Sequence, residues 1–217
     1  MLNVRFIRHG ESLANVGCVT AEPHSIPLTL KGRRQANALS RSFDRTPDLI
    51  ISSPYQRALQ TAEPTVARFP DAPFEIWPVQ EIEMLATARR IGTTSHDRRP
   101  LIETYWAKGD PEYVDGAGAE SYRAFIGRVR EALARLEHFQ EKQAEIAVFG
   151  HEQFMKAVLL EIADPLHEIN NRAMQAFHEF HHANPIANAQ GFSISWNGRQ
   201  WNRLREGGGF DAVAGTE

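Results

Sequence analysis

The chain has 217 residues, a net charge of −3 and 42% apolar residues, which is enough for a full hydrophobic core. A charged fraction of 24% argues against disorder, and the near-neutral balance argues against a nucleic acid or a membrane surface as partner. One cysteine, Cys18, excludes an internal disulfide, and the first residues lack a signal-peptide pattern, so we expect a cytoplasmic protein.

The first third of the chain alternates apolar runs with amphipathic stretches. Thr29 is expected to cap a helix that continues to about Phe43, and a second helix is expected after Pro54. Pro64 predicts a kink or break in that second helix. Residues 3–7 predict a buried strand and residues 48–52 a short apolar strand, and residues 74–77 are expected to form another strand.

The middle of the chain is rich in structure-breaking residues. Between residues 86 and 118 the sequence contains Gly92, Pro100, Gly109, Pro111, Gly116 and Gly118. We therefore expect a lid-like insertion with some short helix, over roughly residues 78–118. Beyond it, the pattern predicts a helix at 119–140, a strand at 145–149, a helix at 154–162, a strand at 192–196 and a loose tail at 207–217.

This alternation of strands and helices predicts an α/β fold. The expected architecture is a single domain over residues 1–217, a three-layer sandwich in which helices cover both faces of a mostly parallel sheet. Ligand sites in such sheets gather at the carboxyl ends of the strands. Three predicted strands end there in polar residues: Arg8 and His9 after the first, Ser53 and Arg57 after the second, and His151 and Glu152 after the fourth.

Two histidines and two arginines at one sheet edge favour phosphate chemistry. The planar guanidinium of arginine matches the oxygens of a phosphate group. A neutral imidazole can attack phosphorus and form a phosphohistidine, and a second imidazole can donate to the phosphoryl oxygens. The cationic side chains supply the electrostatic stabilisation, so we expect no cofactor and no metal.

Four blocks of the sequence, in this order, resemble the histidine phosphatase superfamily, also called the phosphoglycerate mutase-like family. The resemblance covers most of the chain. The blocks are Arg8-His9-Gly10-Glu11-Ser12 with Asn15, Thr29-Leu30-Lys31-Gly32 with Gln35-Ala36, Ser52-Ser53-Pro54-Tyr55-Gln56-Arg57-Ala58 with Gln60-Thr61-Ala62, and Gly150-His151.

The resemblance implies a role for each matching residue. His9 is the expected nucleophile, and Arg8, Arg57 and His151 are expected to bind the transferred phosphoryl group with help from Asn15. His151 also counts among the expected catalytic residues.

A glutamate between the third block and the second histidine usually donates a proton in this family. Glu81 fits that position best, and Glu83 is its rival. The sequence departs from the family at Glu152, because glycine commonly follows the second histidine. Its side chain either points away from the phosphate or selects a cationic substrate as a substrate-binding residue.

The expected function is hydrolysis of a small phosphorylated metabolite, with two alternatives. One is a phosphoglycerate-type mutase, and the other is a non-catalytic module that binds phosphate. His178 and His182 formally match a zinc-binding H-E-x-x-H pattern, although a polar helix face explains them more simply. The arginines of the insertion form either a solvated face or a lid that binds a remote anion: Arg89, Arg90, Arg98 and Arg99.

Overall fold

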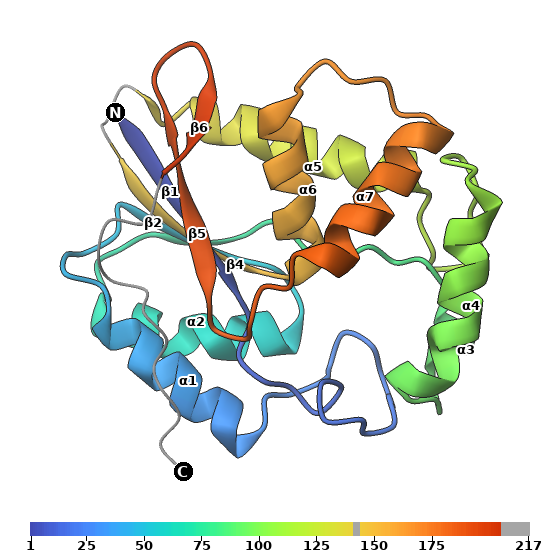
Figure 1. Cartoon of the computed structure of the whole chain (residues 1–217). Coiled ribbons are helices and arrows are strands. Elements are labelled where there is room, and N and C mark those ends of the chain that lie inside the picture. Colours follow the sequence, from blue (N-terminus) through green and yellow to red (C-terminus); the bar gives the residue numbers. More distant parts are fainter. Residues whose placement is uncertain (141–143, 205–217) are drawn as a thin grey trace.

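The computed structural model describes residues 1–140 and 144–204, so the tail expected at 207–217 lies outside the described residues (Figure 1). Within the described residues, six strands form one sheet in the order β3-β2-β4-β1-β5-β6. They are β1 (Leu2–Arg8), β2 (Leu49–Ser52), β3 (Phe74–Ile76), β4 (Glu145–Gly150), β5 (Gly191–Trp196) and β6 (Trp201–Arg203).

The sheet is mostly parallel, as predicted. Strands β3, β2, β4 and β1 run parallel to one another, whereas β5 is antiparallel to β1 and β6 is antiparallel to β5. The antiparallel β6 was not predicted, because three residues give too short a pattern to read. The predicted α/β class is confirmed, and its parallel half carries the strand ends that matter for the site.

Helices cover both faces of this sheet (Figure 1). Helices α1 and α2 pack on one face, and α5 and α6 pack on the other, which gives the expected three layers. Helix α7 packs against α6 and α4, beside the sheet. The helices are α1 (Leu30–Arg41), α2 (Gln56–Arg68), α3 (Thr87–Arg90), α4 (Ser95–Lys108), α5 (Tyr122–Glu137), α6 (Glu152–Ala163) and α7 (Asn171–Ala183).

Side chains of the central strand β1 point alternately to the two faces of the sheet, and each face has its own hydrophobic core. Val4 and Phe6 of β1 point into the larger core, under α5 and α6, whereas Ile7 points into the smaller core with Leu39 of α1. Thr29 caps α1 as predicted, since its side-chain oxygen accepts a hydrogen bond from the backbone N–H of Gly32. Every helix in residues 1–140 and 144–204 is too short or too polar to cross a membrane.

Two expectations about proline and glycine need correction. Of the kink or break expected at Pro64, the break does not occur: α2 continues to Arg68, because one proline removes a single backbone hydrogen bond while Ala62 and Thr65 stay buried. The insertion is more helical than expected, since α4 has 14 residues despite Pro100. A capping box between Thr94 and Asp97 begins α4 and outweighs that proline.

Candidate active site

The carboxyl ends of β1, β2 and β4 bring three predicted residues together. The backbone N–H of His9 donates to the carbonyl of Gly150 at 3.0 Å, and that of Ser53 donates to Phe149 at 2.9 Å. His151 follows Gly150 directly, and its ring centroid lies 5.1 Å from that of His9. Neighbouring parallel strands therefore place the two histidines side by side, as the sequence predicted.

His9 is buried, and its contacts define its tautomer. Nδ1 lies 2.7 Å from the carbonyl oxygen of Gly10, which can only accept, so Nδ1 carries the proton. Nε2 is then an acceptor and lies 3.3 Å from the Nε of Arg57. Burial, followed by the charges of Arg57 and Arg8, holds the pKa of His9 well below its ordinary value. His9 is thus a neutral imidazole with an unprotonated Nε2.

His151 is fully buried and is oriented by Ser53, a residue of the third sequence block for which no role was predicted. Its Nε2 lies 2.9 Å from the Oγ of Ser53, which also accepts the N–H of Tyr55 at 3.2 Å. The Ser53 hydroxyl is therefore available to donate to Nε2, which leaves the proton on Nδ1. That Nδ1 has no hydrogen-bond partner among the described residues. Burial, then the charge of Arg57, lowers the pKa of His151.

The two arginines flank the histidines but are held differently. Arg57 lies in the first turn of α2, donates from Nη1 to the carbonyl of Pro23 at 3.3 Å, and makes no ion pair among the described residues. Burial lowers its pKa to about 10, which leaves it charged at neutral pH. Arg8 ends β1; its Nη1 lies 2.8 Å from Oε2 of Glu152 and also donates to the carbonyl of Ile186. Arg57 is therefore the less neutralised cation.

The two candidate proton donors have different surroundings. Oε1 of Glu81 accepts the backbone N–H of Gln153 at 2.7 Å. Burial raises the pKa of Glu81, although the charges of Arg57 and Arg8 oppose this. The carboxylate of Glu83 instead forms an ion pair with Arg90. Glu81 thus lies within electrostatic range of Arg57 and Arg8, and its role as the acid stays a prediction.

Asn15 stabilises the loop that follows His9. Its Oδ1 accepts hydrogen bonds from the backbone N–H of Ser12 at 3.0 Å and from the hydroxyl of Ser12 at 2.9 Å. It also accepts from Nδ2 of Asn188 at 3.3 Å, and this same amide donates to the carbonyl of His9 at 3.0 Å. Asn188 had no sequence signal, because it belongs to none of the blocks. A contact between Asn15 and phosphate stays a prediction.

The first and second sequence blocks pack directly on each other. A Cβ at Gly10 would lie 2.7 Å from the carbonyl oxygen of Gly32, and a Cβ at Gly32 would lie 2.0 Å from the carbonyl oxygen of Glu11. The hydroxyl of Thr29 donates to Oε1 of Glu11 at 2.8 Å. Both glycines are thus required by close backbone approach, and the second block supports the loop that holds His9.

Comparison with known proteins agrees with this geometry. The family model of the histidine phosphatase superfamily, branch 1, matches residues 4–203. The chain belongs to this superfamily. Adenosylcobalamin/α-ribazole phosphatase of Escherichia coli K12 is 29% identical over 160 residues, which cover 70% of this chain and 75% of that protein.

Solved structures from the superfamily share the fold. An α-ribazole phosphatase from Shigella flexneri superposes with a TM-score of 0.72 at 21% identity, covering 94% of this chain and 95% of that one. A mycobacterial glucosyl-3-phosphoglycerate phosphatase gives a TM-score of 0.68 at 20% identity, covering 94% and 98%. At this level of identity the two structures establish the histidine phosphatase fold and leave the substrate to be argued from the site.

Glu152, the departure from the usual superfamily pattern, is bound on both oxygens. Oε2 pairs with Arg8, and Oε1 accepts from Nζ of Lys156 at 2.7 Å and from the backbone N–H of Ile186 at 3.0 Å. Burial alone would raise the pKa of Glu152, but these donors outweigh it and hold the pKa below its ordinary value. The carboxylate therefore stays charged and braces Arg8. Selection of a cationic substrate by Glu152 remains a prediction.

The H-E-x-x-H histidines lie on α7, where they pack as aromatic rings. His178 stacks on Trp106 with ring centroids 4.9 Å apart, and His182 meets His178 edge-on at 4.6 Å. Across residues 1–140 and 144–204, no group of three or more His, Cys, Asp or Glu side chains could hold a metal ion. Packing accounts for this pair, and independence from metal stays a prediction for this histidine phosphatase.

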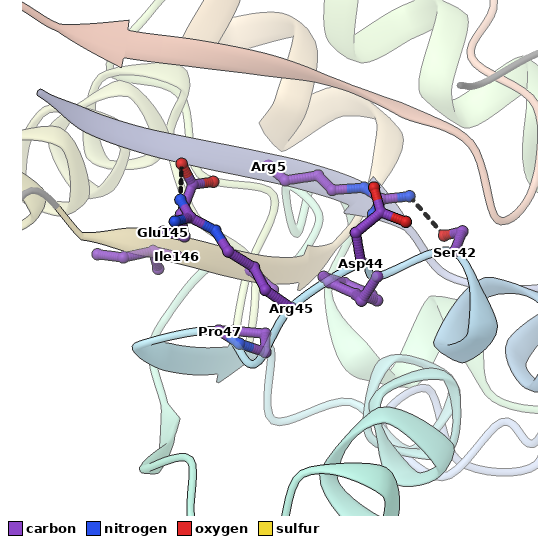
Figure 2. A pocket seen from close by; sticks show the side chains of 9 residues that line it. Arg5, Ser42, Asp44, Arg45, Pro47, Glu145 and Ile146 are labelled. Carbon is purple, nitrogen blue, oxygen red and sulfur yellow. Dashed lines mark hydrogen bonds and ion pairs between the residues drawn. The ribbon is translucent and has the colours of Figure 1, made fainter. Parts of the chain in front are cut away.

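A hollow of about 250 Å³ lies elsewhere, where α1 leads into β2 (Figure 2). Arg5 lines it and donates to the Oγ of Ser42 at 2.8 Å, while Arg45 pairs with Glu145 (Figure 2). Arg5 is the middle residue of β1 and Glu145 the first residue of β4, whereas the histidines follow the last residues of these strands. The hollow is therefore separate from the histidine phosphatase site.

Proposed function

We propose that this chain is a phosphomonoester hydrolase that acts on a small phosphorylated metabolite through a phosphohistidine at His9. The observation that carries the proposal is the state of His9. Its Nδ1 donates to the carbonyl of Gly10, its pKa is lowered, and its unprotonated Nε2 faces Arg57. A buried neutral imidazole with an aligned lone pair beside a guanidinium is suited to attack phosphorus.

In the first step, Nε2 of His9 forms a bond to phosphorus while the bond from phosphorus to the ester oxygen breaks. Arg57 and Arg8 bind the phosphoryl oxygens, and the Nδ1–H of His151 donates to one of them as charge shifts in the transition state. Asn15 assists this binding. Glu81, whose pKa is raised by burial, is the proposed acid that gives its proton to the leaving oxygen.

In the second step, water attacks the phosphorus of the phosphohistidine. The Glu81 carboxylate accepts a proton from this water, the N–P bond breaks, and inorganic phosphate leaves. His9 regains its lone pair and Glu81 regains its proton, so the cycle closes without a cofactor. Every proton is accounted for by a residue of this chain.

Hydrolysis is favoured over the mutase alternative by the relatives, which are named phosphatases. Intact Arg8, His9, Arg57 and His151 argue against a non-catalytic module. The single cysteine favours a cytoplasmic setting, and we propose no nucleic acid or membrane partner.

A panel of phosphomonoesters tests the function by phosphate release, with His9→Ala as the key variant. We expect His9→Ala to retain its fold and less than about 1% of activity, since loss of a nucleophile removes several powers of ten. His138→Ala, at an exposed histidine after α5, is the matched control and should stay active.

The intermediate is tested separately. Enzyme mixed with ³²P-labelled ester and quenched in alkali, where phosphohistidine survives, should carry label on His9. Label on another residue contradicts the mechanism. Dependence on a bisphosphate primer with little phosphate release would instead establish the mutase alternative.

A further inference from the structure

The four arginines of the insertion are already neutralised or bonded within the protein. Each has a partner among the described residues, and three of the partners are carboxylates. The contacts are Arg89 to Asp115 at 3.1 Å, Arg90 to Glu83, Arg98 to the carbonyl of Thr93 at 2.8 Å, and Arg99 to Glu103 at 2.9 Å. The pairs of Arg89 and Arg99 are solvent-exposed at the arginine and therefore weak, whereas the pair of Arg90 with Glu83 is shielded.

Arg90 is the insertion arginine that matters for the phosphate site. Besides burial, the charge of Arg90 lowers the pKa of Arg57, and the charge of Glu81 partly offsets the lowering of the pKa of Arg90 by burial. Arg90 therefore lies within electrostatic range of both residues. The side chains of Arg90 and Glu83 are only 17% and 12% exposed. A pair this well shielded is weakened little by solvent, so Glu83 cancels most of the attraction that Arg90 would exert on a substrate.

Glu83 is firmly held in this position. Its backbone N–H donates to Oε1 of Glu120 at 3.1 Å, and its carbonyl accepts the N–H of Glu120 at 2.8 Å. Arg128 fixes Glu120 through Nε at 3.0 Å and donates to the carbonyl of Pro78 at 2.6 Å. The segment that carries Glu83 is therefore braced from α5, and a substrate anion cannot displace the carboxylate by a simple loop shift.

Other cations around the site also have a carboxylate nearby. Arg8 is paired with Glu152, and Arg90 also feels the charge of Glu22. The imidazole of His24 lies 3.5 Å from the carboxylate of Glu83, and its ring nitrogen can donate a hydrogen bond to an uncharged group of a substrate. Arg57 makes no ion pair among the described residues, and it is assigned to the transferred phosphate.

We propose that Glu83 is a specificity-determining residue that, by neutralising Arg90, selects phosphomonoesters whose remainder carries no carboxylate or other second anion. The proposal rests on the proposed hydrolase function and deepens it, since it names the class of substrate. A remote carboxylate in this site would meet Glu83 and Glu22, while Arg8 and Arg90, the arginines near Arg57 in the described part of the chain, are already paired.

Phosphoethanolamine and phosphoserine test this, because they differ only by one carboxylate. The measured quantity is the ratio of their kcat/KM values. We expect the wild type to prefer phosphoethanolamine. Glu83→Gln should move the ratio toward phosphoserine by about ten- to hundredfold, the range of a charge-assisted hydrogen bond. The double variant Glu83→Gln/Arg90→Met should lose this gain, because the released cation is gone.

Glu103→Gln is the matched control, since it releases Arg99 on α4 in the same way but at the surface. It should leave the ratio unchanged within about twofold. An unchanged ratio in Glu83→Gln, or a wild-type preference for phosphoserine, overturns the proposal. Thermal unfolding of each variant confirms that the fold is kept.

A binding measurement separates this proposal from the hydrolase function. Calorimetric titration of the two esters into His9→Ala, with and without Glu83→Gln, reports the same preference without turnover. If the wild type hydrolyses no ester but the binding ratio shifts as expected, the hydrolase function fails and the role of Glu83 stands. If esters are hydrolysed but neither ratio shifts, the role of Glu83 fails and the function stands.

Discussion

Replacing Glu81 by glutamine is the sharpest test of the proposed acid. Glutamine keeps the length of the side chain, and its amide oxygen can still accept the N–H of Gln153, which Oε1 of Glu81 accepts at 2.7 Å. The substitution therefore removes the transferable proton while preserving the local contact. Any loss of rate then reports proton transfer rather than a collapsed site.

The expected magnitude depends on the leaving group. An alkyl phosphate needs a proton on the departing oxygen, so Glu81→Gln should slow its hydrolysis by ~10²–10⁴-fold, or about 3–5 kcal/mol of barrier. A nitrophenyl phosphate needs almost no proton in the first step and should lose less than about tenfold. Single-turnover rates of phosphoenzyme formation with both esters measure this difference. Glu83→Gln is the control and should show no such dependence on the leaving group.

The pH profile gives an independent check. Reaction requires neutral His9 and protonated Glu81. The pKa of His9 is lowered, so activity should persist into acid below the ordinary histidine range. The pKa of Glu81 is raised, so the rate for alkyl esters should fall as pH rises through that raised value. Glu81→Gln should abolish the alkaline fall. If Glu83→Gln abolishes it and Glu81→Gln does not, the acid has been assigned to the wrong residue.

Three further results are expected. Activity should survive a strong chelator, and loss with EDTA followed by recovery with zinc would contradict the metal-free mechanism. Lys156→Ala should destabilise the fold by about 3 kcal/mol in denaturant unfolding, because it removes a fully buried cation from the half-buried carboxylate of Glu152, whereas Lys31→Ala at an exposed pair should change stability by less than about 1 kcal/mol. Gly32→Ala should lower both activity and melting temperature, since its Cβ collides with backbone, whereas Gly127→Ala meets open space in α5 and should not; equal effects would refute the packing argument.

The fold was predictable where one force dominated. Strands such as β1 and β4 are short apolar runs whose residues face two cores, so burial alone determined them. Helix α4 was underestimated because Pro100 and the flanking glycines were given more weight than the Thr94-x-x-Asp97 spacing, which is itself a capping-box pattern. Helix α2 continues past Pro64 because tertiary packing compensates for one missing backbone hydrogen bond.

The part of the site that could be predicted from the sequence consists of residues that directly follow the ends of parallel strands. His9, Ser53 and His151 meet because parallel strands share an edge, which the alternation of elements implied. Asn188 and the carbonyl of Pro23 contact this site from loops, and no spacing rule connects them with the blocks. Long-range contacts of this kind depend on the loop conformation, which residue patterns do not encode in a readable way.

Glu152 shows why a departure from a family pattern has to be judged with its neighbours. A carboxylate beside a phosphate site should repel the substrate, unless its charge is already used. Here Oε2 binds Arg8 and Oε1 binds Lys156, a lysine that is itself buried and bonded to the carbonyl of His181 at 2.6 Å. Substituting Glu152 alone would leave the cations of Arg8 and Lys156 without the carboxylate between them. The glutamate at this position is therefore explained by its two cationic partners. The carboxylate positions Arg8, and we expect a phosphate group to bind the remaining donors of that guanidinium.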